Sequence, residues 1–102
     1  MKAVRHGDVI LVSVTQIPDA AKQTAKGRVV LAEGEVTGHT HTVEHPSAVM
    51  LSDGMRRYLE IGDTCQLKHQ EHKALKIEPG KYEILIEQEW DYFDQARKTV
   101  VD

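Results

Sequence analysis

Hydrophobic and polar residues alternate along much of this chain. In KYEILIEQEW, residues 81–90, Tyr82, Ile84 and Ile86 fall on one face of an extended segment, and most residues of the other face are polar. This period of two is typical of a β-strand with one buried face. The β-branched run GDVILVSV, residues 7–14, predicts the first strand of the chain.

Turn residues divide the rest of the chain into short segments. They are Pro46, Asp53-Gly54, Gly62-Asp63 and Pro79-Gly80. Their spacing of roughly 8 to 17 residues is the rhythm of an all-β sandwich or barrel. Further strands are expected near residues 28–36, 40–43, 48–52, 55–60, 64–68, 74–78 and 81–89.

One segment does not fit the strand pattern. PDAAKQTAKG, residues 18–27, is rich in Ala, Lys and Gln, with Pro18 near its start and Gly27 at its end, but it has little apolar periodicity. We expect one or two turns of surface helix here, or a plain loop. The sequence thus predicts one all-β domain over residues 1–102, a small antiparallel barrel or sandwich of about seven or eight strands with at most one short helix.

Composition and charge narrow the classes of function. A chain of 102 residues with 40% hydrophobic and 28% charged residues is expected to fold as one soluble domain. A net charge of -3 with scattered Lys and Arg argues against nucleic-acid binding. No apolar run approaches the roughly 20 residues of a membrane span, and the start MKAVRHGDV is polar, so we expect a cytosolic protein without a membrane partner.

Other residues indicate structural roles or partners rather than catalysis. The single cysteine, Cys65, cannot form an internal disulfide, and its strand-like context favours a buried structural role over that of a nucleophile. Trp90, Tyr92 and Phe93 either cap the core or mark a contact surface for a protein partner. Because residues 81–90 would be long for an edge strand, we also expect a homo-oligomer.

The strongest chemical signal is a cluster of histidines. The stretch GEVTGHTHTVEH, residues 34–45, holds three of the six histidines of the chain. On an extended strand, His39 and His41 point to one face about 6 to 7 Å apart, so both could bind one ion. A second cluster, HQEH at residues 69–72, lies in or beside a predicted turn.

Together, the two clusters predict an open metal site. His39, His41 and either His69 or His72 would be its ligands, with Glu44 or Glu71 as a further ligand or as an acceptor for an imidazole N–H. Zinc is the expected ion, with nickel, iron and manganese left open. The alternative is that these histidines only pair with carbonyls or acids and bind nothing; whether His6 and His45 join the site also stays open.

Three motifs follow one another along the chain: RHGDVILV, EGEVTGHTHTV and HQEHKALKIEPGKYEILIEQEWD. In this order they resemble a family of small, functionally uncharacterised proteins encoded in bacterial and phage genomes. A looser resemblance is to the cupins, small β-barrels in which Gly38, His39, His41 and Glu44 would form the first motif, and His69 or His72 the second. The cupin resemblance implies a histidine-bound metal but does not identify a reaction.

Two functions therefore remain. One is a metal-stabilised binding or assembly module, possibly serving a phage or a bacterial multi-protein system. The other is a small cupin-like metalloenzyme with Glu44 and Glu71 as its catalytic acid and base. Known hydrolase signatures such as GxSxG and HExxH are missing from the sequence, and its short loops leave little length for a substrate pocket, so the binding module is favoured.

Overall fold

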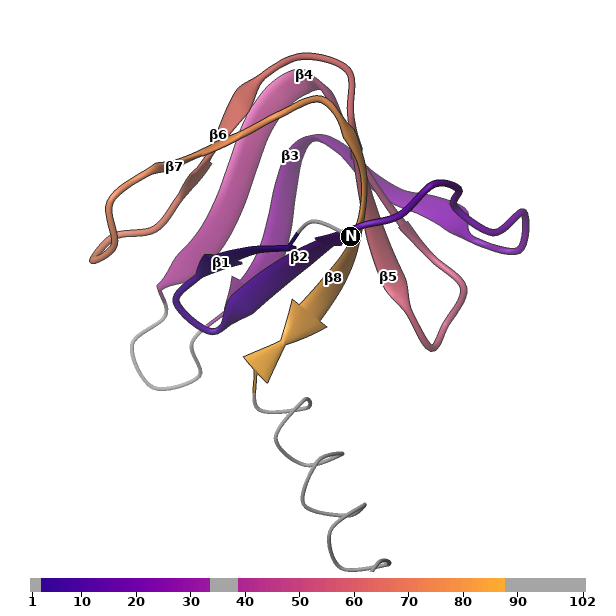
Figure 1. The fold of residues 1–102 in the computed structure, drawn as a ribbon, viewed down its shortest axis with the longest axis horizontal. Coiled ribbons are helices and arrows are strands. Elements are labelled where there is room, and N and C mark those ends of the chain that lie inside the picture. Colours follow the sequence, from indigo (N-terminus) through magenta and orange to yellow (C-terminus); the bar gives the residue numbers. More distant parts are fainter. Residues whose placement is uncertain (1–2, 34–38, 88–102) are drawn as a thin grey trace, which may run out of the picture.

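The computed structural model describes residues 3–33 and 39–87 as a single antiparallel β-sheet curled into a nearly closed barrel (Figure 1). Its strands are β1 (Ala3–His6), β2 (Val9–Ser13), β3 (Lys22–Glu33), β4 (Thr40–Ser52), β5 (Arg57–Ile61), β6 (Cys65–Lys68), β7 (Leu75–Ile77) and β8 (Gly80–Ile86). The prediction of a small all-β barrel is confirmed. In the described part of the chain, no helix has the length and apolar character that crossing a membrane requires.

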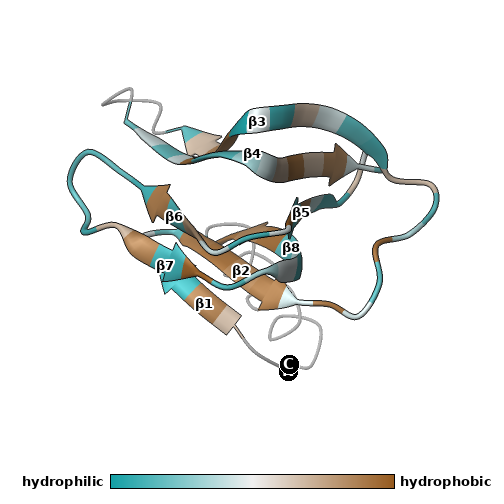
Figure 2. Ribbon diagram, turned by 90° about the horizontal axis from the view of Figure 1, so that it is seen from above, coloured by the Kyte–Doolittle hydropathy of each residue, from teal (hydrophilic) through white to brown (hydrophobic). Residues whose placement is uncertain are grey.

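The strand order explains how distant parts of the chain meet. Neighbouring strands run β1-β2-β8-β5-β4-β6-β7, and β3 pairs with β4 outside this path. Seen from above, β3 and β4 lie on one side of the molecule and β1, β2 and β7 on the other (Figure 2). The curl of the sheet brings the end that carries β1 towards the end that carries β7, and we call this junction the seam.

The core follows from the alternation in the sequence. In β2, Val9 and Leu11 point inwards, and in β8 Tyr82 and Ile84 do the same, because successive side chains of a strand face opposite ways. Cys65 is also buried, as the sequence predicts, and burial raises the pKa of its thiol. The buried cluster consists of Val9, Leu11, Val29, Leu31, Val43, Ala48, Leu59, Ile61, Cys65, Leu67, Ile77, Tyr82 and Ile84.

The expected turn at Pro46 is wrong, because β4 runs through this proline without ending. On β3, Lys26 pairs with Val49 and Arg28 pairs with Glu44, so residues 45–48 of β4 lie opposite Gly27 alone. Gly27 has a φ of 85°, a conformation that suits a bulge. The bulge gives Pro46 a place in a strand where no ladder hydrogen bond is required of it.

Two further segments differ from the sequence predictions. Residues 18–27 contain no helix, and Lys22 onwards belongs to β3, whose backbone pairs with the end of β4. Without an apolar face, this segment has nothing to bury as a helix. The first strand was also missed: β1 pairs with β2 across a turn in which Gly7 has a φ of 62°.

The expected edge strand is not at an edge. β8 lies between β2 and β5, so the argument that residues 81–90 leave an exposed edge does not hold, and the homo-oligomer stays a prediction without that support. Trp90, Tyr92 and Phe93 lie outside the described residues. Among the described strands, β3 pairs with β4 only; its basic residues and three register shifts are features that discourage edge-to-edge pairing.

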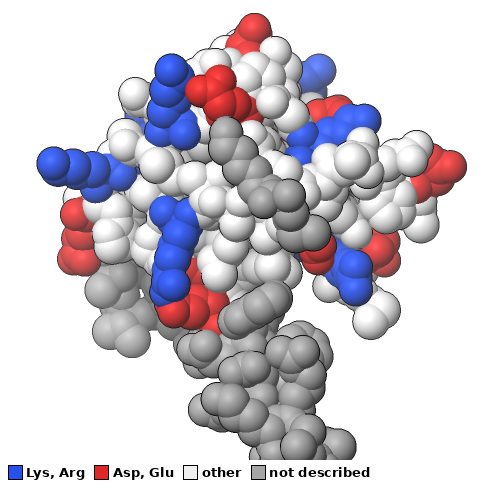
Figure 3. Space-filling view, in the orientation of Figure 1, with Lys and Arg blue, Asp and Glu red and all other residues white. Residues whose placement is uncertain are grey.

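Charged side chains of both signs are interspersed on the face shown in Figure 3. Several form loose pairs across strands, such as Arg56 with Glu83 at 3.9 Å and Lys81 with Glu60 at 4.0 Å. Pairs as exposed as Lys81 and Glu60 contribute about 0 to 1 kcal/mol each. The stability of the fold therefore comes mainly from the apolar core.

Candidate metal centre

Five imidazole rings gather at the seam. The distances between ring centroids are 4.3 Å for His41 and His69, 4.7 Å for His69 and His72, and 5.4 Å for His39 and His69. His6 joins them, with its centroid 5.1 Å from that of His41 and 5.5 Å from that of His72. The structure thus brings together the four histidines expected as ligands and adds a fifth.

Strand register places the two histidine clusters beside each other. β4 pairs with β6 so that Thr42 lies opposite Lys68, and the same antiparallel register leads from Thr42 to His41 and from Lys68 to His69. The loop after β6, residues 69–74, carries the second cluster across the end of the sheet. The backbone N–H of Thr40 donates to Oε1 of Gln70 at 2.9 Å and ties this loop to the start of β4.

Gly7 lets the β1–β2 turn approach two of the rings. A Cβ atom added at this position would lie 2.9 Å from Cε1 of His41 and 2.9 Å from Nε2 of His72. Both contacts are too short for a real side chain, and the φ of 62° is unfavourable for any residue with a Cβ. The close packing of His41 and His72 on the turn therefore requires glycine here.

A chain of polar contacts crosses the seam. Nε2 of His6 lies 2.8 Å from the carbonyl oxygen of Lys73, and Nδ1 of His6 lies 3.0 Å from Nδ1 of His41. Nε2 of His41 lies 3.1 Å from Oδ1 of Asp8. These contacts join β1 and the β1–β2 turn to the start of β4 and to the loop before β7.

This chain of contacts has too few protons when both rings are neutral. The Lys73 carbonyl and the Asp8 carboxylate only accept hydrogen bonds, so each needs an N–H from the ring beside it. The contact between His6 and His41 needs a third N–H, because two bare ring nitrogens repel each other. Two neutral imidazoles carry only two N–H groups in total, so one contact sets a lone pair against a lone pair.

His41 does not supply the missing proton near neutral pH. Burial of the ring and the neighbouring His69 lower the pKa of His41 to about 4, although Asp8 acts in the opposite direction. Burial, followed by the nearby His72 and His39 rings, also lowers the pKa of His69. Near pH 7 the His41 ring is therefore uncharged, which is the form of imidazole that binds metals.

The rings open onto a cavity of about 300 Å³. Its lining combines the four expected histidines with acidic side chains; the residues are Asp8, Ala32, Glu33, His39, His41, His69, Glu71 and His72. Oε1 of Glu71 lies 3.5 Å from Nδ1 of His39. Imidazole nitrogens with carboxylate oxygens are a donor set that suits zinc and other divalent transition metals.

Two of the contacts have the spacing of ligands on one ion. Zinc binds nitrogen and oxygen at about 2.0 to 2.2 Å, so two ligand atoms of one tetrahedral or octahedral ion lie about 2.9 to 3.5 Å apart. The Asp8–His41 contact of 3.1 Å and the His39–Glu71 contact of 3.5 Å both fall in this range. Within residues 3–33 and 39–87, no group of three or more His, Cys, Asp or Glu side chains is arranged to hold a metal ion, so further ligands would have to turn about their side-chain bonds.

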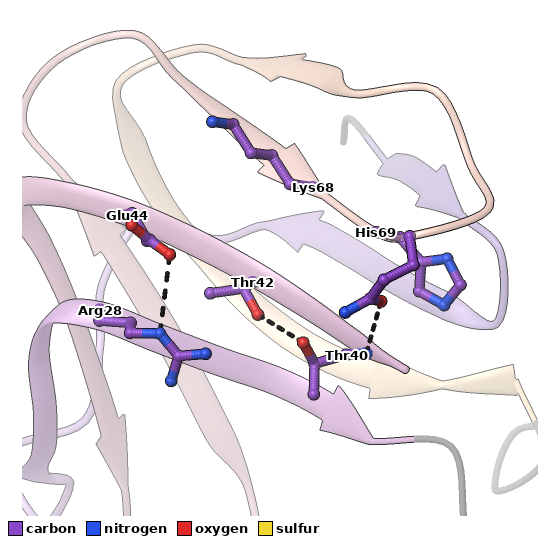
Figure 4. A pocket seen from close by; sticks show the side chains of 7 residues that line it. Arg28, Thr40, Thr42, Glu44, Lys68 and His69 are labelled. Atoms are coloured by element: carbon purple, nitrogen blue, oxygen red, sulfur yellow. Dashed lines mark hydrogen bonds and ion pairs between the residues drawn. The ribbon is translucent and has the colours of Figure 1, made fainter. Parts of the chain in front are cut away.

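Glu44 and His45 are not brought to this cluster. Glu44 lies with Thr40 and Thr42 on the other face of β4, where its Oε1 is 3.6 Å from Nε of Arg28 (Figure 4). His45 is held at the bulge of β4, where its Nδ1 accepts hydrogen bonds from the backbone and hydroxyl of Ser47. Only Glu71 of the two expected acidic residues lines the cavity of the histidines.

The sequence pattern does not indicate Asp8 as a ligand, and it leaves the role of His6 open. The signal for both lies in RHGDV: a glycine followed by an aspartate between two apolar runs is typical of a tight hairpin turn. A hairpin at this position sets Asp8 beside His6. The distance of this hairpin from the other histidines along the chain concealed the connection.

The geometry defines a small antiparallel β-barrel with a histidine- and carboxylate-lined cavity at its seam. The chain matches the family model described as Domain of unknown function (DUF8820) over residues 5–87, and it belongs to this family. The matched stretch contains all six histidines. No curated protein and no solved structure matches the chain, so the resemblance to the cupins rests on sequence motifs alone.

Proposed function

We propose that this protein is a divalent-metal-binding β-domain whose ion joins the two ends of the sheet. The observation that carries the proposal is the contact between Nε2 of His41 and Oδ1 of Asp8, 3.1 Å apart, in a chain of contacts that has one N–H too few when both rings are neutral. A divalent cation between these two atoms supplies the positive charge that both lone pairs need. Zinc is the expected ion, since imidazole nitrogen and carboxylate oxygen are among its common ligands.

His6 and His72 have different roles in this proposal. The contact of His6 with the Lys73 carbonyl leaves Nδ1 of His6 to accept from Nδ1–H of His41, which frees Nε2 of His41 for the metal. His72 supplies the third ligand, because its Nε2 packs against the same glycine as the His41 ring. His6 is therefore a positioning residue, whereas Asp8, His41 and His72 bind the ion.

These ligands suit a metal-stabilised binding or assembly module. Asp8 lies in the β1–β2 turn, His41 in β4 and His72 in the loop before β7, so one ion would cross-link three segments that are distant in sequence. An ion that binds the folded chain but not the unfolded chain adds about 2.7 kcal/mol to the free energy of unfolding at one hundred times its dissociation constant. A stable barrel of this kind offers a rigid surface to a protein partner, as in a phage or bacterial assembly.

Metal content and thermal unfolding of protein without a polyhistidine tag test the proposal. We expect bound zinc after purification or dialysis against zinc, and a melting temperature about 10 °C or more above that of chelator-treated protein. His41→Ala removes the zinc-dependent rise, whereas His45→Ala, a histidine outside the cluster, keeps it. If wild type binds no zinc and its melting temperature changes with neither zinc nor chelator, the proposal is wrong.

A second candidate function is a small metalloenzyme. It is favoured by the open cavity beside the ion and by Glu71, whose side chain is 67% exposed and faces His39. In this role Glu71 acts as acid or base towards a metal-bound water. Glu44 is less suited, because its carboxylate is turned to the other face of β4 and pairs with Arg28.

Hydrolysis of p-nitrophenyl esters and phosphates by zinc-loaded protein tests this second candidate. Glu71→Gln should abolish turnover while the ion between Asp8 and His41 is retained, and Glu44→Gln should have no effect. Turnover that survives in Glu71→Gln would exclude Glu71 as the catalytic acid or base, and turnover that persists without metal would exclude a metal-dependent reaction.

A further inference from the structure

We propose that the cavity at the seam holds a second divalent ion, bound by His39 and Glu71, with His69 as its third ligand. This inference rests on the proposed function, in which the first ion lies between Asp8 and His41. It concerns a separate set of side chains, so its failure and the failure of the first site can be told apart.

The cavity contains two carboxylate–imidazole pairs that share no residue. Asp8 and His41 are 3.1 Å apart, and His39 and Glu71 are 3.5 Å apart, each measured between nitrogen and oxygen. Both spacings match two ligands of a single ion. His39 and His41 therefore face different carboxylates, although their spacing in the sequence suggests ligands of one common ion.

His69 lies between the two pairs. Its ring centroid is 4.3 Å from that of His41 and 5.4 Å from that of His39. His72 already packs with His41 against Gly7 on the side of the first pair. His69 is thus left to complete the second pair, for which its ring turns away from the Glu71 backbone N–H, whose hydrogen bond its Nδ1 accepts at 3.0 Å.

The cavity offers more ligands and more negative charge than a single ion needs. One zinc ion takes about four protein or water ligands, so the four imidazoles and three carboxylates that line the cavity exceed what one ion needs. Asp8, Glu33 and Glu71 bring three acidic side chains into a cavity of about 300 Å³. Two divalent ions offset these charges.

The experiment is a count of zinc ions per chain by equilibrium dialysis and elemental analysis, on untagged protein at pH 7. Wild type should bind two ions. The double variant His39→Ala, Glu71→Gln should bind one and keep most of the zinc-dependent rise in melting temperature. Asp8→Asn with His41→Ala removes the first pair and should abolish that rise.

Matched controls exclude weak surface binding and misfolding. Glu44→Gln and His45→Ala alter the same residue types outside the cavity and should leave the count at two. Because the Glu71 side chain is 67% exposed, Glu71→Gln alone should retain the far-ultraviolet circular dichroism of wild type and lower the occupancy or affinity of the second ion only.

Three results overturn the inference. A count of one in wild type that is unchanged in the His39, Glu71 variant removes the second ion and leaves the first. A count of one that falls to zero in the same variant shows that His39 and His41 share a single ion. A count of zero in wild type removes both sites.

Discussion

Nδ1 of His6 and Nδ1 of His41 meet 3.0 Å apart across the seam of the barrel. Each ring turns its other nitrogen to an acceptor, Lys73 for His6 and Asp8 for His41. The two rings therefore act as one unit, in which the proton on one nitrogen decides what the other nitrogens can bind. This unit links the closure of the sheet to the proposed binding of a metal.

Removing His6 tests its role as a positioning residue. In His6→Ala, His41 loses the neighbour that fixes its tautomer, and zinc affinity should fall about 10- to 100-fold, as for other residues that orient metal ligands. The number of ions per chain should not change. Isothermal titration with zinc measures both quantities; an unchanged affinity would contradict this role.

Gly7→Ala tests the packing of the turn on two rings. The added Cβ would meet His41 and His72 at 2.9 Å, on a backbone that already disfavours side chains. Gly54→Ala is the matched control, because Gly54 also has a positive φ, of 95°, but nothing lies within 4 Å of its Cβ position. The backbone conformation alone costs about 1 to 2 kcal/mol in each variant.

We therefore expect Gly7→Ala to lower the free energy of unfolding by about 1 kcal/mol or more beyond Gly54→Ala, and to weaken zinc binding. Urea unfolding with and without zinc provides the comparison. Equal losses in the two variants, with zinc affinity unchanged in both, would mean that the turn does not press on the rings.

The pKa of His41 predicts how stability depends on pH in metal-free protein. The folded pKa of about 4 lies below the value of about 6.5 for an unfolded chain, so between these values the unfolded chain binds a proton that the folded chain does not. Stability should therefore rise with pH across this window and fall on acidification. The contribution is at most about 3 kcal/mol, and it should vanish in His41→Asn.

Urea unfolding from pH 4 to pH 7 measures this dependence. His45→Asn is the control, since His45 accepts its hydrogen bonds from Ser47 at the bulge, away from the cluster. A slope that is the same in wild type and His41→Asn would show that other groups govern the acid sensitivity.

The alternation in THTV predicts that His39 and His41 lie on one face of a strand. The register of β4 with β6 explains why His69 meets them. The same alternation, applied to Glu44, places it on the opposite face from His41, as the structure does, so Glu44 is a poor candidate for the same site. Asp8 and His6 could not be placed from local pattern. Their position depends on the curl of the whole sheet, a property of twist and packing rather than of any one segment.

Pro46 shows a second limit of predicting the structure from the sequence. A proline between apolar runs favours a turn, but the bulge opposite Gly27 lets one long strand pair with β3 along its length and with β6 and then β5 on its other side. Bulges depend on the residues of both paired strands, and the partner strand is not visible in a local pattern. The sequence therefore predicts the histidines at the start of β4 but not the bulge in its middle.

The most direct test of the central claim is the nitrogen-15 resonance of Nε2 of His41, measured near pH 7 before and after zinc is added. We predict that this nitrogen carries no proton in metal-free protein and moves to a metal-bound shift with zinc, while Nδ1 stays protonated. A protonated Nε2 whose resonance is the same with and without zinc would contradict the proposal that Asp8 and His41 hold a metal ion.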